Sequence, residues 1–191
     1  MPEALLARSP LRAHVAPEIS HIGQPGVVLR ERTDLTLAQV GSFRGREQEL
    51  ADAVRSAFGV DLPTSPKRVA SGAVAFVWAG PGKWLATSTA GTDFTGLPAA
   101  VADQSDGRAV LSISGVKARE TLATLISLDL HPRAFAPGDA ALTHAASIST
   151  LLWQVDDKPT YELVCFRTFA ATLWRWIVHA GMSRGIDAKL G

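Results

Sequence analysis

Residues Ala109–Leu122 combine a β-like run, a small-residue turn and a segment of helical periodicity. A strand that leads through such a turn into a helix N-terminus is an arrangement that many proteins use to bind phosphate. The turn is Ser114-Gly115, and Lys117 and Arg119 follow it. Dinucleotide sites and P-loops need further glycines, as G-x-G-x-x-G or G-x-x-x-x-G-K-[ST], and this segment has neither spacing. We therefore expect an ordinary helix capped by Ser114, and rank nucleotide binding last among the alternatives.

The other reactive side chains form no recognisable catalytic set. Cys165 is the one cysteine, which excludes an internal disulfide, and its apolar setting in YELVCF favours a buried thiol over a nucleophile. The pair Asp156-Asp157 lies in DDKPTYE, which is typical of a solvated hairpin turn. None of the histidines shows the H-x-x-x-H spacing of zinc sites: they are His14, His21, His131, His144 and His179. We therefore predict no catalytic, cofactor-binding or metal-binding residues in this chain.

Two tryptophans flank a predicted turn. Residues 72–89 have the pattern of strand, turn and strand, with Gly80-Pro81-Gly82-Lys83 as the turn. Trp78 and Trp84 stand on either side of it. They are expected to anchor the hairpin to the core, and the alternative is a stacking platform for a planar ligand.

The bulk composition indicates a protein with a substantial core. Of the 191 residues, 47% are hydrophobic and 19% are charged, which argues against global disorder. The net charge is +1 without a basic run, so we expect no nucleic-acid partner. No apolar stretch approaches the roughly 20 residues of a membrane span, and the N-terminus lacks a secretory pattern. We expect a soluble cytoplasmic protein with no membrane partner.

The first half of the chain predicts strands and one helix. Prolines in residues 1–20 favour an extended arm. The polar turn ERTD divides residues 27–43 into two strands that we expect to pair with each other. In the segment REQELADAVRSAFG, apolar residues recur at helical spacing, and Gly59 follows as the expected C-terminal cap.

The second half repeats this mixture of strands and helices. After the strand that opens it, residues 115–128 are predicted to be helical, with Val116 and Leu122 on the apolar face. Residues 141–155 and 160–167 are predicted strands joined by a hairpin turn. The segment TFAATLWRWIVHAG is a predicted helix whose buried stripe is Phe169, Leu173, Trp176 and Ile177.

These elements predict an α+β fold with mixed or antiparallel sheets and packed helices, in two β-rich halves with a helix each. The expected organisation is an N-terminal arm at 1–20, one domain at 21–185 and a tail at 186–191. The domain can be divided into two subdomains, at about 21–100 and 101–185.

Several segments together resemble the gamma subunits of heterotetrameric sarcosine oxidases. The matching segments cover the chain from about residue 9 to residue 181 in the family's order: SPL at Ser9–Leu11, FGVDLP at Phe58–Pro63, WAGPGKWLA at Trp78–Ala86, DQSDGRAVLSISGVKARETL at Asp103–Leu122, LDLHPRAF at Leu128–Phe135 and RTFAATLWRWIVHAG at Arg167–Gly181. The combination of SDGR, LDLHPRAF and the LWRW helix is the most specific part.

The resemblance implies a fold related to the folate-binding aminomethyltransferases, which include the glycine-cleavage T-proteins. It implies a non-catalytic, structural gamma subunit in an assembly that oxidatively demethylates sarcosine to glycine, with hydrogen peroxide as product and a one-carbon unit passed to tetrahydrofolate. The partners would be the alpha, beta and delta subunits, chiefly the large alpha subunit. FAD, FMN, NAD and tetrahydrofolate would be held by those other subunits, and no cofactor by this chain.

This sequence departs from the family at the predicted hairpin, where Ala79, Gly82 and Lys83 replace a leucine and an acidic pair. The acidic motif of the folate transferases has no match, so no folate-binding residue is carried over. A free-standing folate-binding aminomethyltransferase-like protein remains the alternative function. Trp153, Trp174 and Arg175 are candidate interface anchors, although core packing is the favoured interpretation of the two tryptophans. We expect Arg108 or Arg119 to face a partner.

Overall fold

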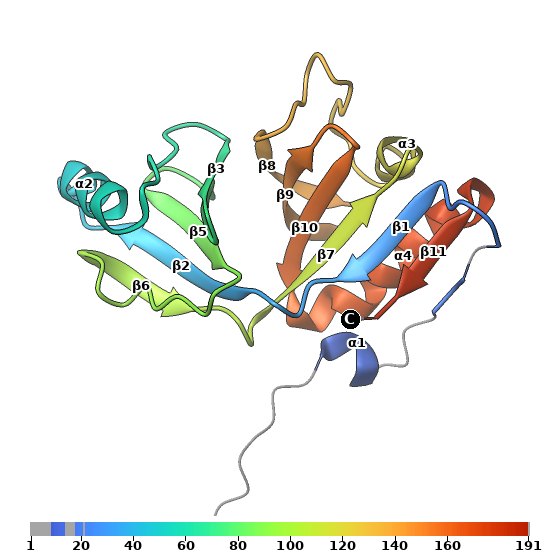
Figure 1. Cartoon of the computed structure of the whole chain (residues 1–191), viewed down its shortest axis with the longest axis horizontal. Helices are drawn as coiled ribbons and strands as arrows, with labels where there is room; N and C mark the ends of the chain where they lie inside the picture. The colour runs from blue at the N-terminus through green and yellow to red at the C-terminus, as the bar shows by residue number, and fades with distance from the viewer. Residues whose placement is uncertain (1–8, 14–17, 21, 191) are drawn as a thin grey trace, which may run out of the picture.

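Two β-sheets lie side by side in the computed structural model, which describes residues 9–13, 18–20 and 22–190 (Figure 1). The large sheet has the strand order β11 (Ile186–Lys189), β1 (Val27–Glu31), β7 (Arg108–Ser114), β10 (Thr160–Phe166), β9 (Ile148–Asp156) and β8 (Ala140–Ala145). The small sheet has the order β3 (Arg68–Ser71), β4 (Val74–Trp78), β5 (Lys83–Ser88), β2 (Thr36–Ser42) and β6 (Ala99–Asp103). The mixed α+β fold with two β-rich halves is confirmed.

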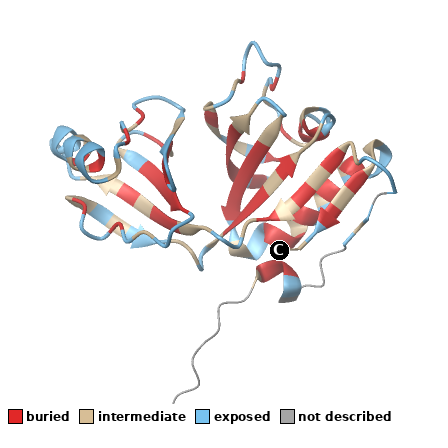
Figure 2. Ribbon diagram, in the orientation of Figure 1, coloured by how far each residue is buried: buried red, intermediate tan, exposed pale blue. Residues whose placement is uncertain are grey.

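Helices cover one face of the large sheet. They are α3 (Ala118–Leu122), α4 (Ala170–Gly181) and the single turn α1 (Pro10–Ala13). Short 3₁₀ turns lie directly before and after α4, at Arg167–Phe169 and Met182–Arg184. Alternate strand residues such as Leu111 and Leu163 pack with Leu173 and Trp174 of α4 in a fully buried core. Figure 2 shows an alternation of buried and intermediate residues along β1, whereas the central strands β9 and β10 are buried over most of their length. None of the described helices is long and apolar enough to cross a membrane.

Helix α2 (Glu47–Phe58) covers the outer face of the small sheet (Figure 1). Leu50 and Val54, one helical turn apart, are its buried residues, as the apolar spacing predicts. The helix ends at Gly59, which adopts the left-handed conformation with φ of 64°. This helix and the β4–β5 hairpin confirm two of the predictions from the first half of the chain.

The predicted pairing of the strands within residues 27–43 is wrong. Strand β1 belongs to the large sheet, between β7 and β11, whereas β2 lies in the small sheet between β5 and β6. The polar residues between β1 and β2 therefore form a crossing from one sheet to the other. The large sheet consequently contains a strand from the first half of the chain.

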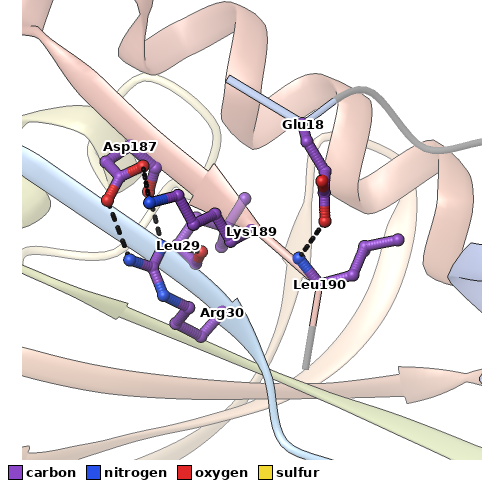
Figure 3. A network of polar contacts seen from close by, with 6 residues as sticks. All are labelled: Glu18, Leu29, Arg30, Asp187, Lys189 and Leu190. Atoms are coloured by element: carbon purple, nitrogen blue, oxygen red, sulfur yellow. Dashed lines mark hydrogen bonds and ion pairs between the residues drawn. The ribbon is translucent and has the colours of Figure 1, made fainter. Parts of the chain in front are cut away.

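The predicted C-terminal tail is a strand at Ile186–Lys189. Strand β11 pairs in parallel with β1, and the Arg30 guanidinium reinforces the pairing with hydrogen bonds to the Asp187 backbone carbonyl and carboxylate (Figure 3). The backbone N–H of Leu190 donates to the Glu18 carboxylate at 2.9 Å in the same network. Burial of Ile186 and Ala188 in the large core fixes this strand in place.

The predicted N-terminal arm is ordered where the structure describes it. Residues 10–13 form a helical turn whose Leu11 is fully buried against the large sheet, and Ile19 forms an antiparallel bridge with Ala188. The rest of the predicted arm, residues 1–8 and 14–17, lies outside the described residues.

Three local predictions differ from the structure. Helix α3 is much shorter than the predicted 115–128, Val116 is 76% exposed, and the Ser114 side chain makes no capping hydrogen bond. The predicted strand at 141–155 is the β8–β9 hairpin, which turns at Ala146 with a positive φ of 50°. Phe169 precedes α4 and is half exposed, since the 3₁₀ turn rotates it away from the stripe that buries Trp174.

Candidate interaction site

The seam between the two sheets is the candidate functional region, because it brings together polar and charged side chains that a hydrophobic core does not need. Its middle is apolar and buried, where Val77 and Leu85 of the small sheet pack against Val110, Leu151 and Val164 of the large one. Polar clusters lie at its two ends. We call the cluster of Arg32, Arg68, Trp153 and Glu162 the closed end, and the cluster of Arg108, Leu142 and Phe166 the open end.

Strand register places the closed end inside the seam. Glu162 lies opposite Trp153 on the neighbouring strand, and Trp153 belongs to the buried seam cluster. Arg68 lies opposite Val77, which belongs to the same cluster. Residues directly opposite each other share a face of the sheet, so Glu162 and Arg68 point into the seam from the two sheets.

Hydrogen bonds satisfy the buried carboxylate of Glu162, which is only 4% exposed. The indole Nε1 of Trp153 donates to its Oε2 at 2.8 Å, and the Arg32 guanidinium forms an ion pair with its Oε1. Arg32 also holds Asp34 through two hydrogen bonds of 2.7 and 2.9 Å. These bonds lower the pKa of the Asp34 carboxyl and raise the pKa of Arg32. The cluster thus joins residues that are 130 positions apart in the chain.

Arg68 is the arginine of the closed end whose side chain is less well satisfied. Its Nε is buried and has no hydrogen-bond partner among the described residues. Burial lowers the pKa of Arg68, while the charge of Glu162 opposes that shift. The backbone around Arg68 is fixed, because its N–H donates to the Gly138 carbonyl at 2.7 Å and the neighbouring Lys67 pairs with Asp139. These bonds link the edge of the small sheet to the large one and close this end of the seam.

The open end combines a cation with exposed apolar side chains. Arg108 lies opposite Phe166 across β7 and β10, and its guanidinium sits 4.0 Å from the centre of the Phe166 ring. Its Nε donates to Gln104 at 3.3 Å, and burial lowers the pKa of Arg108. Leu142 on the edge strand β8 is 54% exposed, and Phe166 is 48% exposed. A hollow of about 180 Å³ lies between these residues and the small sheet.

A second hollow, of about 170 Å³, is also lined by Arg108 and includes a buried carboxylate, that of Glu31. The Ser9 hydroxyl donates to Glu31 at 2.5 Å and ties the α1 turn to the large sheet. Burial raises the pKa of the Glu31 carboxyl, and the Ser9 hydrogen bond and the charges of Arg167 and Arg12 oppose that shift. The polar groups of this hollow therefore serve the attachment of the N-terminal segment.

Comparison with known proteins shows which family has this architecture. Residues 44–183 match the model of the sarcosine oxidase, gamma subunit family. The chain belongs to that family. A sarcosine oxidase subunit gamma from Arthrobacter sp. is 35% identical over 169 residues, which covers 83% of this chain and 82% of the relative. A second one, from Corynebacterium sp. (strain P-1), is 32% identical over 91% of this chain and 89% of the relative.

Solved structures agree with this assignment of the gamma-subunit chain. A chain in the structure of heterotetrameric sarcosine oxidase from Corynebacterium sp. U-96 superposes with a TM-score of 0.78 and 27% identity, over 94% of this chain and 96% of that one. The glycine cleavage system aminomethyltransferase T from Bartonella henselae superposes with a TM-score of 0.56 and 14% identity, over 94% of this chain and 50% of that one. The expected resemblance to the aminomethyltransferase fold is thus confirmed at the level of the fold.

Backbone atoms of Gly26 occupy the space beside the Ser114-Gly115 turn. Gly115 has a φ of +108°, and a Cβ there would lie 2.6 Å from the Gly26 carbonyl oxygen. That same oxygen accepts the backbone N–H of Lys117 at 2.9 Å. The side chain of Lys117 pairs with Glu120, and Arg119 donates to the Tyr161 hydroxyl. The close approach that glycine allows is to Gly26, the residue before β1, so the turn does not fit a nucleotide phosphate.

The remaining candidates for chemistry lie apart from one another. Cys165 is fully buried, and burial raises the pKa of its thiol to about 12. Asp156 accepts the Lys158 backbone N–H in the β9–β10 hairpin turn. The exposed His131, His144 and His179 lie on separate elements, and His14 and His21 lie outside the described residues. Across the described part of the chain, no three His, Cys, Asp or Glu residues are grouped as metal ligands would be.

The tryptophans named as anchors are core residues. Trp153 and Trp174 are fully buried, so burial in the monomer removes them from the surface that a partner could reach. Trp84 packs in the small-sheet core and donates to the Pro63 carbonyl at 2.8 Å, which supports the hairpin anchor over the stacking platform. Arg175 on α4 is exposed. Sequence reasoning singled out Arg108 but missed Leu142 and Phe166, whose exposure depends on where the small sheet ends.

Proposed function

We propose that this chain is the gamma subunit of a heterotetrameric sarcosine oxidase. The observation that carries the proposal is the superposition on a chain of that assembly over nearly the full length of both. Two relatives named sarcosine oxidase subunit gamma, which this chain matches along most of their length, support the proposal independently. The reaction of the assembly would be the oxidative demethylation of sarcosine to glycine, with hydrogen peroxide as product and the one-carbon unit passed to tetrahydrofolate.

The role proposed for this chain is structural, with FAD, FMN, NAD and tetrahydrofolate held by the other subunits. The hollows described above, and one of about 260 Å³ beside Thr92 and Phe94, are smaller than the roughly 300–1,000 Å³ of pockets for drug-sized ligands. Gly115, the one glycine at a strand-to-helix turn of the second half, packs against Gly26. These residues do not fit a dinucleotide, so no catalytic step is assigned to this chain.

The free-standing aminomethyltransferase-like alternative is not favoured. The chain spans half of the aminomethyltransferase that it resembles, and the likeness at 14% identity concerns the fold alone. The curated gamma subunits, by contrast, match along most of their own length.

Co-expression tests the proposal. The affinity-tagged chain is produced together with the alpha, beta and delta subunits, and the purified material is examined for composition, flavin absorbance and sarcosine-dependent peroxide formation. We expect a yellow complex of all four chains, chiefly through contacts with the large alpha subunit. Recovery of the tagged chain alone would contradict the proposal, as would calorimetric heat from micromolar tetrahydrofolate binding to the isolated chain.

A further inference from the structure

We propose that the open end of the seam, formed by Arg108, Leu142 and Phe166, docks a segment of a partner subunit that presents a carboxylate beside an apolar side chain. This inference rests on the proposed function, since it names the surface through which a gamma subunit would contact its assembly. Two independent features of the open end, its charge and its apolar surface, determine the chemistry of the occupant.

The charge feature is the arginine. Arg108 is half-buried, and no carboxylate among the described residues lies within ion-pair distance of its guanidinium. Its interactions are one 3.3 Å hydrogen bond to the neutral Gln104 and the face of the Phe166 ring. A partly desolvated cation gains most from a charged acceptor, and the planar guanidinium favours a carboxylate that can accept two hydrogen bonds.

The apolar feature flanks this cation on the same face of the large sheet. Phe166 and Leu142 are half exposed, although the residues two positions before each of them, Val164 and Ala140, are buried in the seam. The small sheet therefore ends before it covers them. Exposed aromatic and aliphatic side chains around an arginine have the composition of an interface core, and the hollow of about 180 Å³ beside them can accept a side chain.

A protein segment fits the open end better than a free small ligand does. The hollow is lined by strands of both sheets, among them β2 and β5 of the small sheet and the edge strand β8 of the large one. A free carboxylate would use Arg108 and leave the apolar side chains in water. A segment with both groups covers all three residues at once, and burial of Leu142 and Phe166 then adds to the ion pair.

Four variants, co-expressed with the alpha, beta and delta subunits, test the proposal. Arg108→Glu reverses the charge, and Leu142→Asp places a carboxylate in the apolar part. Arg44→Glu and Met182→Asp are the matched controls, because both residues are exposed and lie away from the open end. The readout is the amount of large subunits recovered per tagged chain. We expect each open-end variant to recover at least about tenfold less than wild type and each control to stay within about twofold.

The outcomes separate the docking site from the proposed function. Wild type that recovers no other subunit contradicts the proposed function. If wild type recovers the other subunits and both open-end variants recover as much as the controls do, the docking site alone is overturned. Loss in Leu142→Asp with full recovery in Arg108→Glu overturns the carboxylate as the group recognised. Urea unfolding of each isolated variant, with an unchanged midpoint, shows that a loss of partner is not a loss of fold.

Discussion

The two ends of the seam differ in how the charge of an arginine is accommodated. At the closed end the chain itself supplies the carboxylate, and Trp153 and Arg32 complete the hydrogen bonds of Glu162. At the open end the Arg108 side chain contacts a neutral amide and an aromatic ring, and no carboxylate of the described residues forms an ion pair with it. The fold thus supplies a carboxylate, Glu162, to the arginines of the closed end, although the Nε of Arg68 is left without a hydrogen bond. At the open end the carboxylate is left for an external group. We expect the internal carboxylate to contribute to the stability of the monomer, and the arginine without one to contribute to association.

The largest expected effect is at the closed end, from Glu162→Gln. The substitution removes the negative charge between two arginines, and removal of one partner from a buried pair costs about 3–5 kcal/mol of the free energy of unfolding. Glu49→Gln is the control, since the exposed Glu49–Arg46 pair should contribute no more than about 1 kcal/mol. Urea unfolding of the isolated chain measures both. Equal losses in the two variants would remove the distinction between a buried cluster and a surface pair.

The next effect contrasts two leucines on neighbouring strands. Leu151 is buried in the middle of the seam, whereas Leu142 at the open end is half exposed. Leu151→Ala should destabilise the chain by about 2–3 kcal/mol because it leaves a cavity, and Leu142→Ala by less than about 1 kcal/mol. The midpoints of thermal or urea unfolding check this. A large loss in Leu142→Ala would mean that this residue belongs to the core of the monomer.

A smaller effect of opposite sign is expected from Arg68→Met. The substitution keeps an unbranched apolar side chain in the seam and removes a buried cation whose Nε has no partner. We expect the free energy of unfolding to rise by about 1 kcal/mol, as when a poorly satisfied buried charge is replaced by a hydrophobic residue. Destabilisation instead would show that attraction between Arg68 and Glu162 outweighs the cost of burying the charge.

The smallest effect concerns pH and the carboxylate next to the open end. Since folding raises the pKa of Glu31 above its ordinary value of 4.5, the folded state binds more protons than the unfolded state just above that pH. The contribution of Glu31 to stability is therefore full below its unfolded pKa and falls as pH rises through the folded pKa. Since glutamine does not ionise, the Glu31→Gln variant should not show this loss of stability as pH rises. Its free energy of unfolding relative to that of wild type should therefore increase from pH 4 to pH 7. A relative stability that drops over this range would mean that Arg167 and Arg12 outweigh burial.

Local sequence patterns were sufficient to predict the elements that are stabilised by contacts between residues close in the sequence. The spacing of Leu50 and Val54 and the glycine after α2 predicted that helix, and the Gly80-Pro81 turn predicted the β4–β5 hairpin. Pairing between distant strands was not predictable in this way. Strand β1 pairs with β7 and β11, which lie about 80 and 160 residues further along the chain. Nothing in the sequence of β1 identifies these two strands as its neighbours.

The site was less predictable than the fold, because its properties arise between the sheets. The pairing of Arg32 with Glu162 requires both sheets to be in place. Arg108 was singled out as facing a partner, although only its position opposite Phe166 shows what surrounds it. The exposure of Leu142 has no sequence signal, since its apolar type and position in β8 equally suit a buried residue.

Hydrogen–deuterium exchange of the chain, alone and within the co-expressed complex, tests the contrast between the two ends most directly. We predict that assembly slows exchange in residues 141–145 and 164–169 around the open end, because a partner covers them. Exchange at residues 66–71 and 153–162 around the closed end should stay unchanged. Protection confined to the closed end, or unaltered exchange at both ends in an intact complex, would contradict the account.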